Sequence, residues 1–290
     1  MALQNLKDFH RPDAIEDVLA LLGKDEETLI LAGGTFLRGL EARGLLSGVE
    51  ALVDIRRVGL DKVVADNNGI KAGAAVTFTR LRGVVARQQE AWLGGLADAL
   101  DRPPVQVRNV ATVGGCIAAA CPFFDVPTAL LALDAELTIR SSDGERHLPL
   151  PELFDGLFAN TLEPGEFITE VSLPRPPGNA AGAFLKLEAT ANDLAIVNVA
   201  TQLSIDANRV CTRACVALGG GVADTAVRSA AAETILVGSR LDAAALQAAG
   251  EAVISDIDPM SDHRASAAYR RAVAKVMTRR ALERAVARLA

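Results

Sequence analysis

Apolar residues in the first 60 positions change from helical spacing to strand spacing. Asp13 is a candidate N-cap for a helix over residues 13–22, in which apolar positions recur every three or four residues. A short apolar run at residues 28–31 ends at a glycine pair, and a second strand is predicted at residues 51–55. The apolar helix positions are Ile15, Val18, Leu19 and Leu22. This order of elements is typical of a mixed α/β lobe.

The segment from Lys62 to Pro174 contains two predicted hairpins with helices between them. The first pairs residues 62–65 with 70–72 across Asp66-Asn67-Asn68-Gly69, and the second pairs residues 136–140 with 146–150 across Ser142-Asp143-Gly144. Between them the pattern predicts helices near residues 78–86, 92–100 and 127–133, and a β-type run at residues 105–113. We expect this part of the fold to close near Pro174.

A change of pattern follows the segment Pro174-Arg175-Pro176-Pro177-Gly178. Three prolines make this segment stiff and remove backbone donors, as expected of a linker. Strands are then predicted at residues 184–187, 195–205 and 210–218, and helices fill most of residues 226–290. The sequence therefore predicts a second domain of the α+β class, after a main boundary at this linker.

Composition and charge exclude several classes of function. Half of the 290 residues are hydrophobic and the formal net charge is −6, which is ordinary for a globular protein and unfavourable for a duplex-binding surface. The first ten residues mix charged and apolar positions, so they do not resemble a secretory signal. Glycines, prolines and an aspartate interrupt the least polar stretch, residues 113–133. We expect a cytoplasmic protein without nucleic acid and without a membrane span.

The four cysteines do not show the spacing of a metal site. Cys116 with Cys121, and Cys211 with Cys215, form two distant pairs without a Cys-x-x-Cys motif. Four cysteines are enough to hold an iron–sulfur cluster, but buried, reduced thiols are the commoner explanation in a cytoplasmic protein. We therefore assign them no chemistry and predict no metal ligand in this chain.

Two glycine pairs carry the candidate chemistry. Gly33-Gly34 and Gly114-Gly115 each follow an apolar β-type run, and glycine turns leave backbone N–H groups uncovered by side chains. Such N–H groups can bind phosphate, so two loops of this kind could hold one dinucleotide. Neither loop matches the Gly-x-Gly-x-x-Gly or the Gly-x-x-x-x-Gly-Lys-Ser/Thr motif. Taken alone, a glycine pair after a strand is more often just a turn.

The residues around both glycine pairs resemble those of a known protein family. Leu31-Ala32-Gly33-Gly34-Thr35 and Ala111-Thr112-Val113-Gly114-Gly115, followed by Cys121-Pro122 and Asp125, resemble the flavin subunits of the xanthine dehydrogenase and carbon monoxide dehydrogenase family. The resemblance continues to Asp262-His263-Arg264-Ala265-Ser266 and Tyr269-Arg270-Arg271. It thus extends over nearly the whole chain.

The resemblance implies an α+β protein that binds FAD. Lobes at residues 1–57 and 58–176 would form a two-lobed FAD-binding domain of the vanillyl-alcohol-oxidase (PCMH) type. Residues 180–290 would form a carbon monoxide dehydrogenase flavoprotein C-terminal domain. The glycine loops would hold the pyrophosphate and ribityl chain, Asp125 would lie near the ribose or adenosine, and Ile168 and Lys186 would line the flavin pocket. The implied cofactor residues are Leu31, Ala32, Gly33, Gly34, Thr35, Phe36, Ala111, Thr112, Gly114, Gly115, Cys116, Ala118, Ala119, Asp125, Ile168 and Lys186.

Two of these positions depart from the family pattern. Phe36 stands where an acidic residue is usual, and Cys116 stands where Asn is usual. Because Phe cannot accept a hydrogen bond and Cys is a weak donor, backbone or water would replace these contacts, or flavin affinity would be lower. No cysteine-rich insertion for a [4Fe–4S] cluster lies between Glu136 and Pro174.

The resemblance also implies a function and partners. The chain would be the FAD-binding electron-transfer subunit of a heterotrimeric molybdenum hydroxylase, with a large molybdenum-cofactor subunit and a small [2Fe–2S] subunit. Two such heterotrimers would associate, and NAD, oxygen or a quinone would accept the electrons. No catalytic acid, base or nucleophile is then required of this chain. The alternatives are a free-standing flavin-dependent oxidoreductase and a flavin-free interaction scaffold.

The C-terminal segment is strongly basic in an otherwise acidic chain. Its positive charges are read either as a solvated helix face or as an electrostatic docking face for an acidic subunit. The residues are Arg264, Arg270, Arg271, Lys275, Arg279, Arg280, Arg284 and Arg288.

Overall fold

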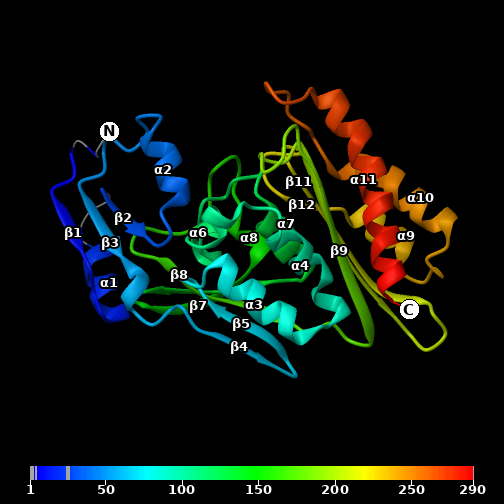
Figure 1. Ribbon diagram of the computed structural model, residues 1–290, viewed down its shortest axis with the longest axis horizontal. Helices are drawn as coiled ribbons and strands as arrows, with labels where there is room; N and C mark the ends of the chain where they lie inside the picture. The colour runs from blue at the N-terminus through cyan, green and yellow to red at the C-terminus, as the bar shows by residue number, and fades with distance from the viewer. Residues whose placement is uncertain (1–2, 4, 24–26, 290) are drawn as a thin grey trace.

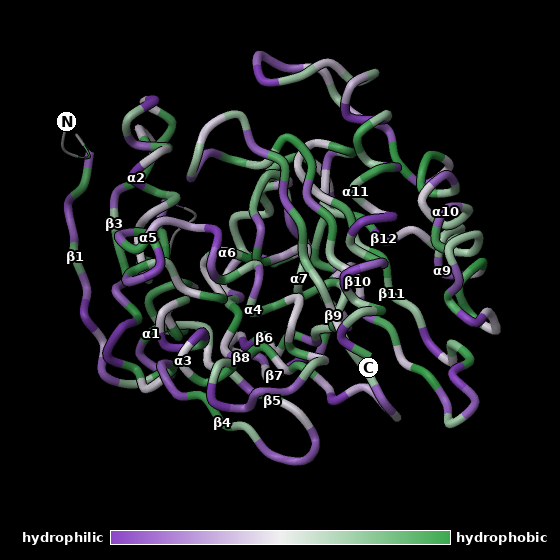
Figure 2. The backbone as a smooth tube through the Cα atoms, turned by 45° about the vertical axis from the view of Figure 1, so that its right-hand side comes forward, coloured by the Kyte–Doolittle hydropathy of each residue, from purple (hydrophilic) through white to green (hydrophobic). Residues whose placement is uncertain are grey.

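Three β-sheets follow one another along the chain in a computed structural model that describes residues 3, 5–23 and 27–289. In Figure 1 the N-terminal sheet lies at one end, the last helices lie at the other, and the middle sheet with its helices lies between them. In Figure 2, hydrophilic positions are frequent at the periphery, for example along β1 (Asp8–His10). Within the described residues no helix is both long and apolar enough to span a bilayer.

The N-terminal lobe is a parallel three-stranded sheet with two helices. The strands β1, β3 (Ala51–Asp54) and β2 (Thr28–Leu31) lie in that order. Helix α1 (Ile15–Leu22) and helix α2 (Thr35–Glu41) precede and follow β2. The predicted helix and strands are confirmed, but the predicted cap is wrong: Ala14 is the N-cap of α1, and Asp13 instead pairs with Arg57 at 2.8 Å.

The middle lobe is an antiparallel five-stranded sheet covered by helices. Its strand order is β4-β5-β8-β6-β7, and both predicted hairpins are present. Its strands are β4 (Val63–Asp66), β5 (Gly69–Gly73), β6 (Glu136–Ser141), β7 (Gly144–Pro149) and β8 (Phe167–Pro174). Its helices are α3 (Phe78–Gln88), η2 (Ala91–Leu93), α4 (Gly94–Leu100), α5 (Val105–Arg108), α6 (Val113–Ala118), α7 (Asp125–Ala132) and α8 (Leu150–Leu153).

The β-type run predicted at residues 105–113 is wrong, because the segment forms α5 and the start of α6. Pro104 has extended φ and ψ angles of −60° and 154° at the N-cap of α5, where its missing N–H costs no helical hydrogen bond. Thr112 caps α6 through Gly115 N–H, and Val113 and Ile117 of α6 are buried in the core. Capping and burial thus override the strand preference of the β-branched residues.

The C-terminal domain is an antiparallel four-stranded sheet with helices on one face. The order is β12-β11-β10-β9, with strands β9 (Asn179–Leu187), β10 (Val197–Ile205), β11 (Cys211–Gly219) and β12 (Val227–Arg228). Its helices are α9 (Ala230–Leu236), α10 (Ala243–Ala252), η3 (Val253–Asp256) and α11 (Ala267–Arg288). All nine residues of β10 are buried, because α11 packs on β10 on one side and α7 on the other. The three predicted strands are confirmed, whereas β12, β8 and β1 were not predicted.

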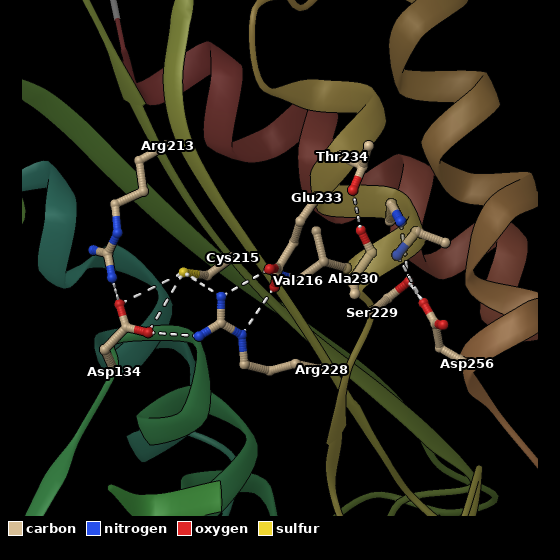
Figure 3. A network of polar contacts seen from close by, with 12 residues as sticks. Asp134, Arg213, Cys215, Val216, Arg228, Ser229, Ala230, Glu233, Thr234 and Asp256 are labelled. Carbon is tan, nitrogen blue, oxygen red and sulfur yellow. Dashed lines mark hydrogen bonds and ion pairs between the residues drawn. The ribbon is translucent and has the colours of Figure 1, made fainter.

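Two networks of polar side chains connect the middle lobe to the C-terminal domain. Asp98 of α4 accepts hydrogen bonds from Arg284, Arg288 and the N–H of Phe184. Asp134, which follows α7, contacts Arg213, the thiol of Cys215 and Arg228, whose Nη1 lies 2.7 Å from Asp134 Oδ1 (Figure 3). Both networks use arginines of the C-terminal domain as partners for carboxylates of the middle lobe.

Internal pairing accounts for most of the basic C-terminal segment. Arg270 is completely buried, and Lys275 and Arg279 pair with Glu251 and Glu283. Arg264, Arg271, Arg284 and Arg288 also pair with carboxylates of this chain. These pairs favour a structural role for the positive charges over a docking face. Arg264, moreover, precedes α11 and lies in a loop.

Candidate functional site

A cleft of about 1360 Å³ lies where the N-terminal lobe, the middle lobe and the C-terminal domain meet. Its volume exceeds the upper range of about 1,000 Å³ for sites that hold drug-sized ligands, so it suits a larger ligand. Every residue predicted at the cofactor lines this cleft except Leu31. The Leu31 side chain instead packs behind the glycine turn, 3.1 Å from the position that a Cβ on Gly34 would take. The fold thus brings together segments far apart in the sequence.

The first glycine pair forms the tight turn that was predicted. A Cβ on Gly33 would lie 1.9 Å from the carbonyl oxygen of Val110, so a side chain cannot fit there. Gly34 has φ of +70° and is the N-cap of α2, where no side chain caps the helix. The first N–H groups of a helix have no intrahelical acceptor. The N–H groups of Thr35 and Phe36 are therefore available to an anionic ligand in the cleft.

The second glycine pair differs from its prediction. It lies in the first turn of α6 rather than after a strand, and its amides are already bonded within the protein. Gly114 N–H donates to Ala74 O at 2.9 Å, and Gly115 N–H donates to Thr112 Oγ1 at 3.3 Å. A Cβ on Gly114 would lie 2.5 Å from Cβ of Ala74. This pair therefore permits close packing beside the cleft and does not supply the uncovered amides that were expected.

A buried charged cluster forms part of the cleft wall. Lys186 Nζ lies 3.0 Å from Asp125 Oδ2, 3.0 Å from Glu188 Oε2 and 2.6 Å from the carbonyl oxygen of Asp193. The side chains of Lys186 and Asp125 are only 3% and 6% exposed. Burial raises the pKa of Asp125, although the charge of Lys186 and hydrogen bonds from Lys186 and Asn198 act in the opposite direction. The ammonium group thus donates to two acceptors, Asp125 and Asp193, and forms an ion pair with Glu188, whose Oε2 is buried and accepts no hydrogen bond.

Asn198 continues this cluster into the C-terminal domain. Its Nδ2 donates to Asp125 Oδ1 at 3.1 Å and to the carbonyl oxygen of Phe124 at 3.1 Å. Thr128 Oγ1 in turn donates to Asn198 Oδ1 at 3.0 Å. Asn198 has this position because alternate residues of β10 face α7, while Val197 and Val199 belong to the core of the C-terminal domain. Neither Asn198 nor Thr128 carries a sequence signal that predicts a place at the site.

Three phenylalanines form an aromatic group in the cleft. Phe36 packs edge-on against Phe124, with ring centroids 5.9 Å apart, and stacks on Phe158 at 6.1 Å. Phe158 has φ of +58° and remains 46% exposed at the loop that follows α8. Phe36 thus makes apolar contacts at the position where the resemblance implies an acidic side chain. Phe124 and Phe158 carry no motif, so the sequence alone did not connect them with Phe36.

The two cleft cysteines are protonated thiols. Burial raises the pKa of Cys116 well above the ordinary value, and the nearby Cys121 and Asp125 raise it further. Burial also raises the pKa of Cys121 to about 11, although hydrogen bonds from backbone N–H groups and the charges of Arg264 and Arg43 act in the opposite direction. Thiols with such pKa values are poor nucleophiles at neutral pH.

The loop at residues 260–264 reaches the cleft from the C-terminal domain. Met260, Asp262, His263 and Arg264 all line it. This segment is part of the family resemblance, but the resemblance did not place it at the cofactor. Its only signal was an Asp-His-Arg run in front of a helix, which is not specific for a binding site.

These features fit a dinucleotide cofactor. The cleft is large, a helix N-terminus without a side-chain cap opens on it, and a Cβ could not be accommodated at Gly33. Its walls are mostly apolar and contain few charged groups, as is usual where an aromatic ring system binds. The described residues hold no cluster of three or more His, Cys, Asp or Glu side chains suited to a metal ion.

Comparisons with known proteins agree with this fit. Residues 4–176 match the model of the FAD binding domain in molybdopterin dehydrogenase, and residues 182–285 match the CO dehydrogenase flavoprotein C-terminal domain. The chain is 35% identical over 285 residues to the 6-hydroxypseudooxynicotine dehydrogenase complex subunit alpha of Paenarthrobacter nicotinovorans, covering 97% of this chain and 95% of that protein.

Carbon monoxide dehydrogenases are similar in both sequence and structure. The medium chain from Afipia carboxidovorans is 33% identical over 283 residues, with 97% of each chain covered. A chain of the reconstituted CO dehydrogenase from Oligotropha carboxidovorans superposes with a TM-score of 0.92 at 32% identity, covering 99% of this chain and 100% of that chain. The chain therefore belongs to the FAD-binding medium subunits of the molybdenum hydroxylase family, and it is an oxidoreductase subunit.

Proposed function

We propose that this chain is the electron-transfer subunit of a heterotrimeric molybdenum hydroxylase. It would receive electrons from [2Fe–2S] clusters of a small subunit and deliver them through FAD to an external acceptor. The observation that carries the proposal is the single large cleft, which contains the glycine turn, α6 and the Lys186 cluster together. The cleft residues include no thiolate nucleophile, and the Lys186 ammonium already donates to Asp125 and Asp193. A role in electron transfer requires neither.

The side chains of this protein would bind and orient the cofactor. FAD supplies the redox chemistry when it is bound. The N–H groups at the start of α2 would bind the pyrophosphate, and Gly114 would let α6 pack closely against Ala74 beside the cofactor. The proposed cofactor set is the one implied by the family resemblance, with Leu31 acting from behind the turn rather than by contact. The Lys186 cluster would exclude water from one side of the ring and hold a positive charge near it.

The partners follow from the same proposal. The complex would contain a large molybdenum-cofactor subunit and a small [2Fe–2S] subunit, and two heterotrimers would associate. NAD, oxygen or a quinone would accept the electrons, and the substrate would be oxidised on the large subunit. A similar chain in Eubacterium barkeri is named a nicotinate dehydrogenase FAD-subunit, and one in Escherichia coli is named a xanthine dehydrogenase FAD-binding subunit.

We also propose the predicted division of the chain, with lobes at residues 1–57 and 58–176 and a C-terminal domain at residues 180–290. The sheets support it, since each of the three is made from strands of only one of these segments.

The experiment is expression of the chain alone and together with its two proposed partner subunits. We expect a yellow protein that releases about one FAD per chain and that co-purifies with both partners. A colourless chain that takes up no added FAD would contradict the proposal and support the scaffold alternative. A yellow chain that does not associate with either partner and that oxidises a substrate by itself would support the free-standing oxidoreductase.

A further inference from the structure

Asp262 organises the loop that reaches the cleft from the C-terminal domain. Arg270 of α11 is completely buried, and its Nη2 lies 2.8 Å from Asp262 Oδ1. The rest of the Arg270 guanidinium donates to the carbonyl oxygens of Ile196, Met260 and Ala265 at distances from 2.5 to 3.1 Å. Arg270 therefore attaches residues 260–265 to Ile196, the residue before β10, and it fixes the conformation of the loop.

The same carboxylate also faces Arg264. Arg264 Nη1 lies 3.2 Å from Asp262 Oδ2, and the guanidinium lies above the ring of Phe123 at 5.0 Å from its centroid. A completely buried arginine requires a counter-charge, so the negative charge of Asp262 is needed by Arg270. One positive charge is left over, on the side chain of Arg264 at the wall of the cleft.

Most of the donors of Arg264 have no acceptor within the part of the chain that the structure describes. Asp262 Oδ2 accepts from Nη1, and the other four N–H groups of the guanidinium have no described acceptor. The side chain is only 15% exposed, so it is held at the wall and does not extend into solvent. An ordered guanidinium with unused donors is suited to bidentate contact with an anion.

A second arginine approaches the same part of the cleft from the N-terminal lobe. Arg43 follows the last turn of α2, is exposed and lines the cleft. Phe36 of α2 packs against Phe124, and Arg264 lies over the neighbouring Phe123, so α2 and the 260–264 loop meet the same segment of the cleft. The charges of Arg43 and Arg264 also both act on the thiol of Cys121. Two arginines from different domains therefore line the cleft near one segment of the chain.

We propose that Arg264 and Arg43 form an anion-binding subsite of the cleft and that this subsite takes a phosphate group. The inference rests on the proposed function, because the phosphate belongs either to the bound FAD or to an incoming acceptor that carries phosphate. The positive charges of the two arginines favour phosphate as the ligand, since together they complement a group with up to two negative charges. A ligand in this subsite would contact both the N-terminal lobe and the C-terminal domain.

The test compares ligands with and without phosphate on the full chain. Apoprotein is titrated with FAD and with riboflavin, which has the same ring but no phosphate, and FAD-loaded protein is titrated with inorganic pyrophosphate. The variants are Arg264→Gln and Arg43→Gln, with Arg264→Lys to restore the charge and exposed Arg280→Gln as the control. We expect each Gln variant to weaken one phosphate-bearing ligand about tenfold or more, as for loss of a charge-assisted hydrogen bond. Riboflavin binding should not change.

The two sources give different results. If FAD supplies the phosphate, the preference for FAD over riboflavin falls in both Gln variants. If the acceptor supplies it, FAD binding is unchanged and pyrophosphate binding to the FAD-loaded protein weakens. The proposal is wrong if both Gln variants equal Arg280→Gln in both titrations. A wild-type chain that binds no FAD at all would instead reject the proposed function.

Discussion

Lys186 and Asp125 belong to different domains and form a buried ion pair, with Nζ 3.0 Å from Oδ2. Lys186 lies on β9 of the C-terminal domain, and Asp125 is the first residue of α7 in the middle lobe. The pair closes one side of the cleft only when both domains are folded against each other. The proposed cofactor binding would therefore depend on domain association through this contact.

Replacing Lys186 by Met should destabilise the protein strongly. Removal of one partner leaves the carboxylate of Asp125 buried without its counter-charge, which costs about 3–5 kcal/mol. The double variant Lys186→Met with Asp125→Asn should recover a large part of this loss, because position 125 then carries no charge and only Glu188, whose side chain is 23% exposed, lacks its ion-pair partner. Urea unfolding measures both. The control is Lys275→Met. Lys275 pairs with Glu251, and their side chains are 38% and 50% exposed, so this variant should lose about 1 kcal/mol or less of unfolding free energy.

Replacing Gly33 by Ala should lower both stability and FAD content. The new Cβ would meet the backbone oxygen of Val110 at 1.9 Å, so the turn must shift, at a cost of about 1–3 kcal/mol. Gly48→Ala is the control, since a Cβ there meets nothing within 4 Å and the residue does not line the cleft. It should stabilise by about 0.4–1 kcal/mol, because Ala restricts the unfolded chain more than Gly does. Equal FAD-to-protein ratios in the two variants would show that the turn does not position the cofactor.

The contribution of Asp262 should depend on pH. Burial acts to raise the pKa of Asp262, but hydrogen bonds from Arg270, Arg264 N–H and Ala265 N–H outweigh it and lower the pKa from 3.8 to about 2. A lowered pKa stabilises the fold above the unfolded value, and this stabilisation is lost as the pH falls through the folded value. The shift corresponds to about 2 kcal/mol at pH 7.

Urea unfolding of Asp262→Asn at several pH values tests this. At pH 7 the free energy of unfolding of the variant should be lower than that of wild type by at least about 2 kcal/mol. This difference should shrink as the pH falls from 4 towards 2. The fully exposed Asp258, replaced by Asn, should show little loss at either end of this range. A pH-independent loss in Asp262→Asn would mean that packing of the loop, and not the charge, is what the carboxylate provides.

Phe36 and Phe158 should be energetically coupled. Their rings stack with centroids 6.1 Å apart, and such pairs contribute about 0.5–1.5 kcal/mol beyond burial. A double-mutant cycle with Phe36→Leu and Phe158→Leu should return a coupling energy in this range. Limited proteolysis within residues 155–160 should also become faster in both single variants. Strict additivity would indicate that the stacking holds no loop in place.

The regular elements were predictable where one signal dominated. The hairpins around Asp66-Asn67-Asn68-Gly69 and Ser142-Asp143-Gly144 combine turn residues with flanking strands, and both formed as expected. The strand predicted at residues 105–113 was wrong because the β-branched residues there favour a strand, whereas Pro104 and Thr112 start helices. Strand β8 was missed because its pairing partners β5 and β6 are distant in sequence.

The site was only partly predictable for the same reason. The glycine pairs and Lys186 could be placed through the family resemblance, and they do line one cleft. The sequence could not show that the amide of Gly114 is bonded within the protein, because its partner Ala74 is far away along the chain. Nor could it show that Asp262 faces two arginines, since this depends on how α11 packs beside β10.

The fully buried strand β10 has a consequence for synthesis of the protein. The walls of the cleft formed by the glycine turn and α6 leave the ribosome early, whereas Lys186, Asn198 and Arg264 follow much later in the chain. Domains generally fold as units during synthesis, the N-terminal one first. The middle lobe is then made before β10 can cover α7, so an apolar face of this helix stays uncovered until β10 has been synthesised. Stable retention of the cofactor therefore comes as a late step in the maturation of this subunit.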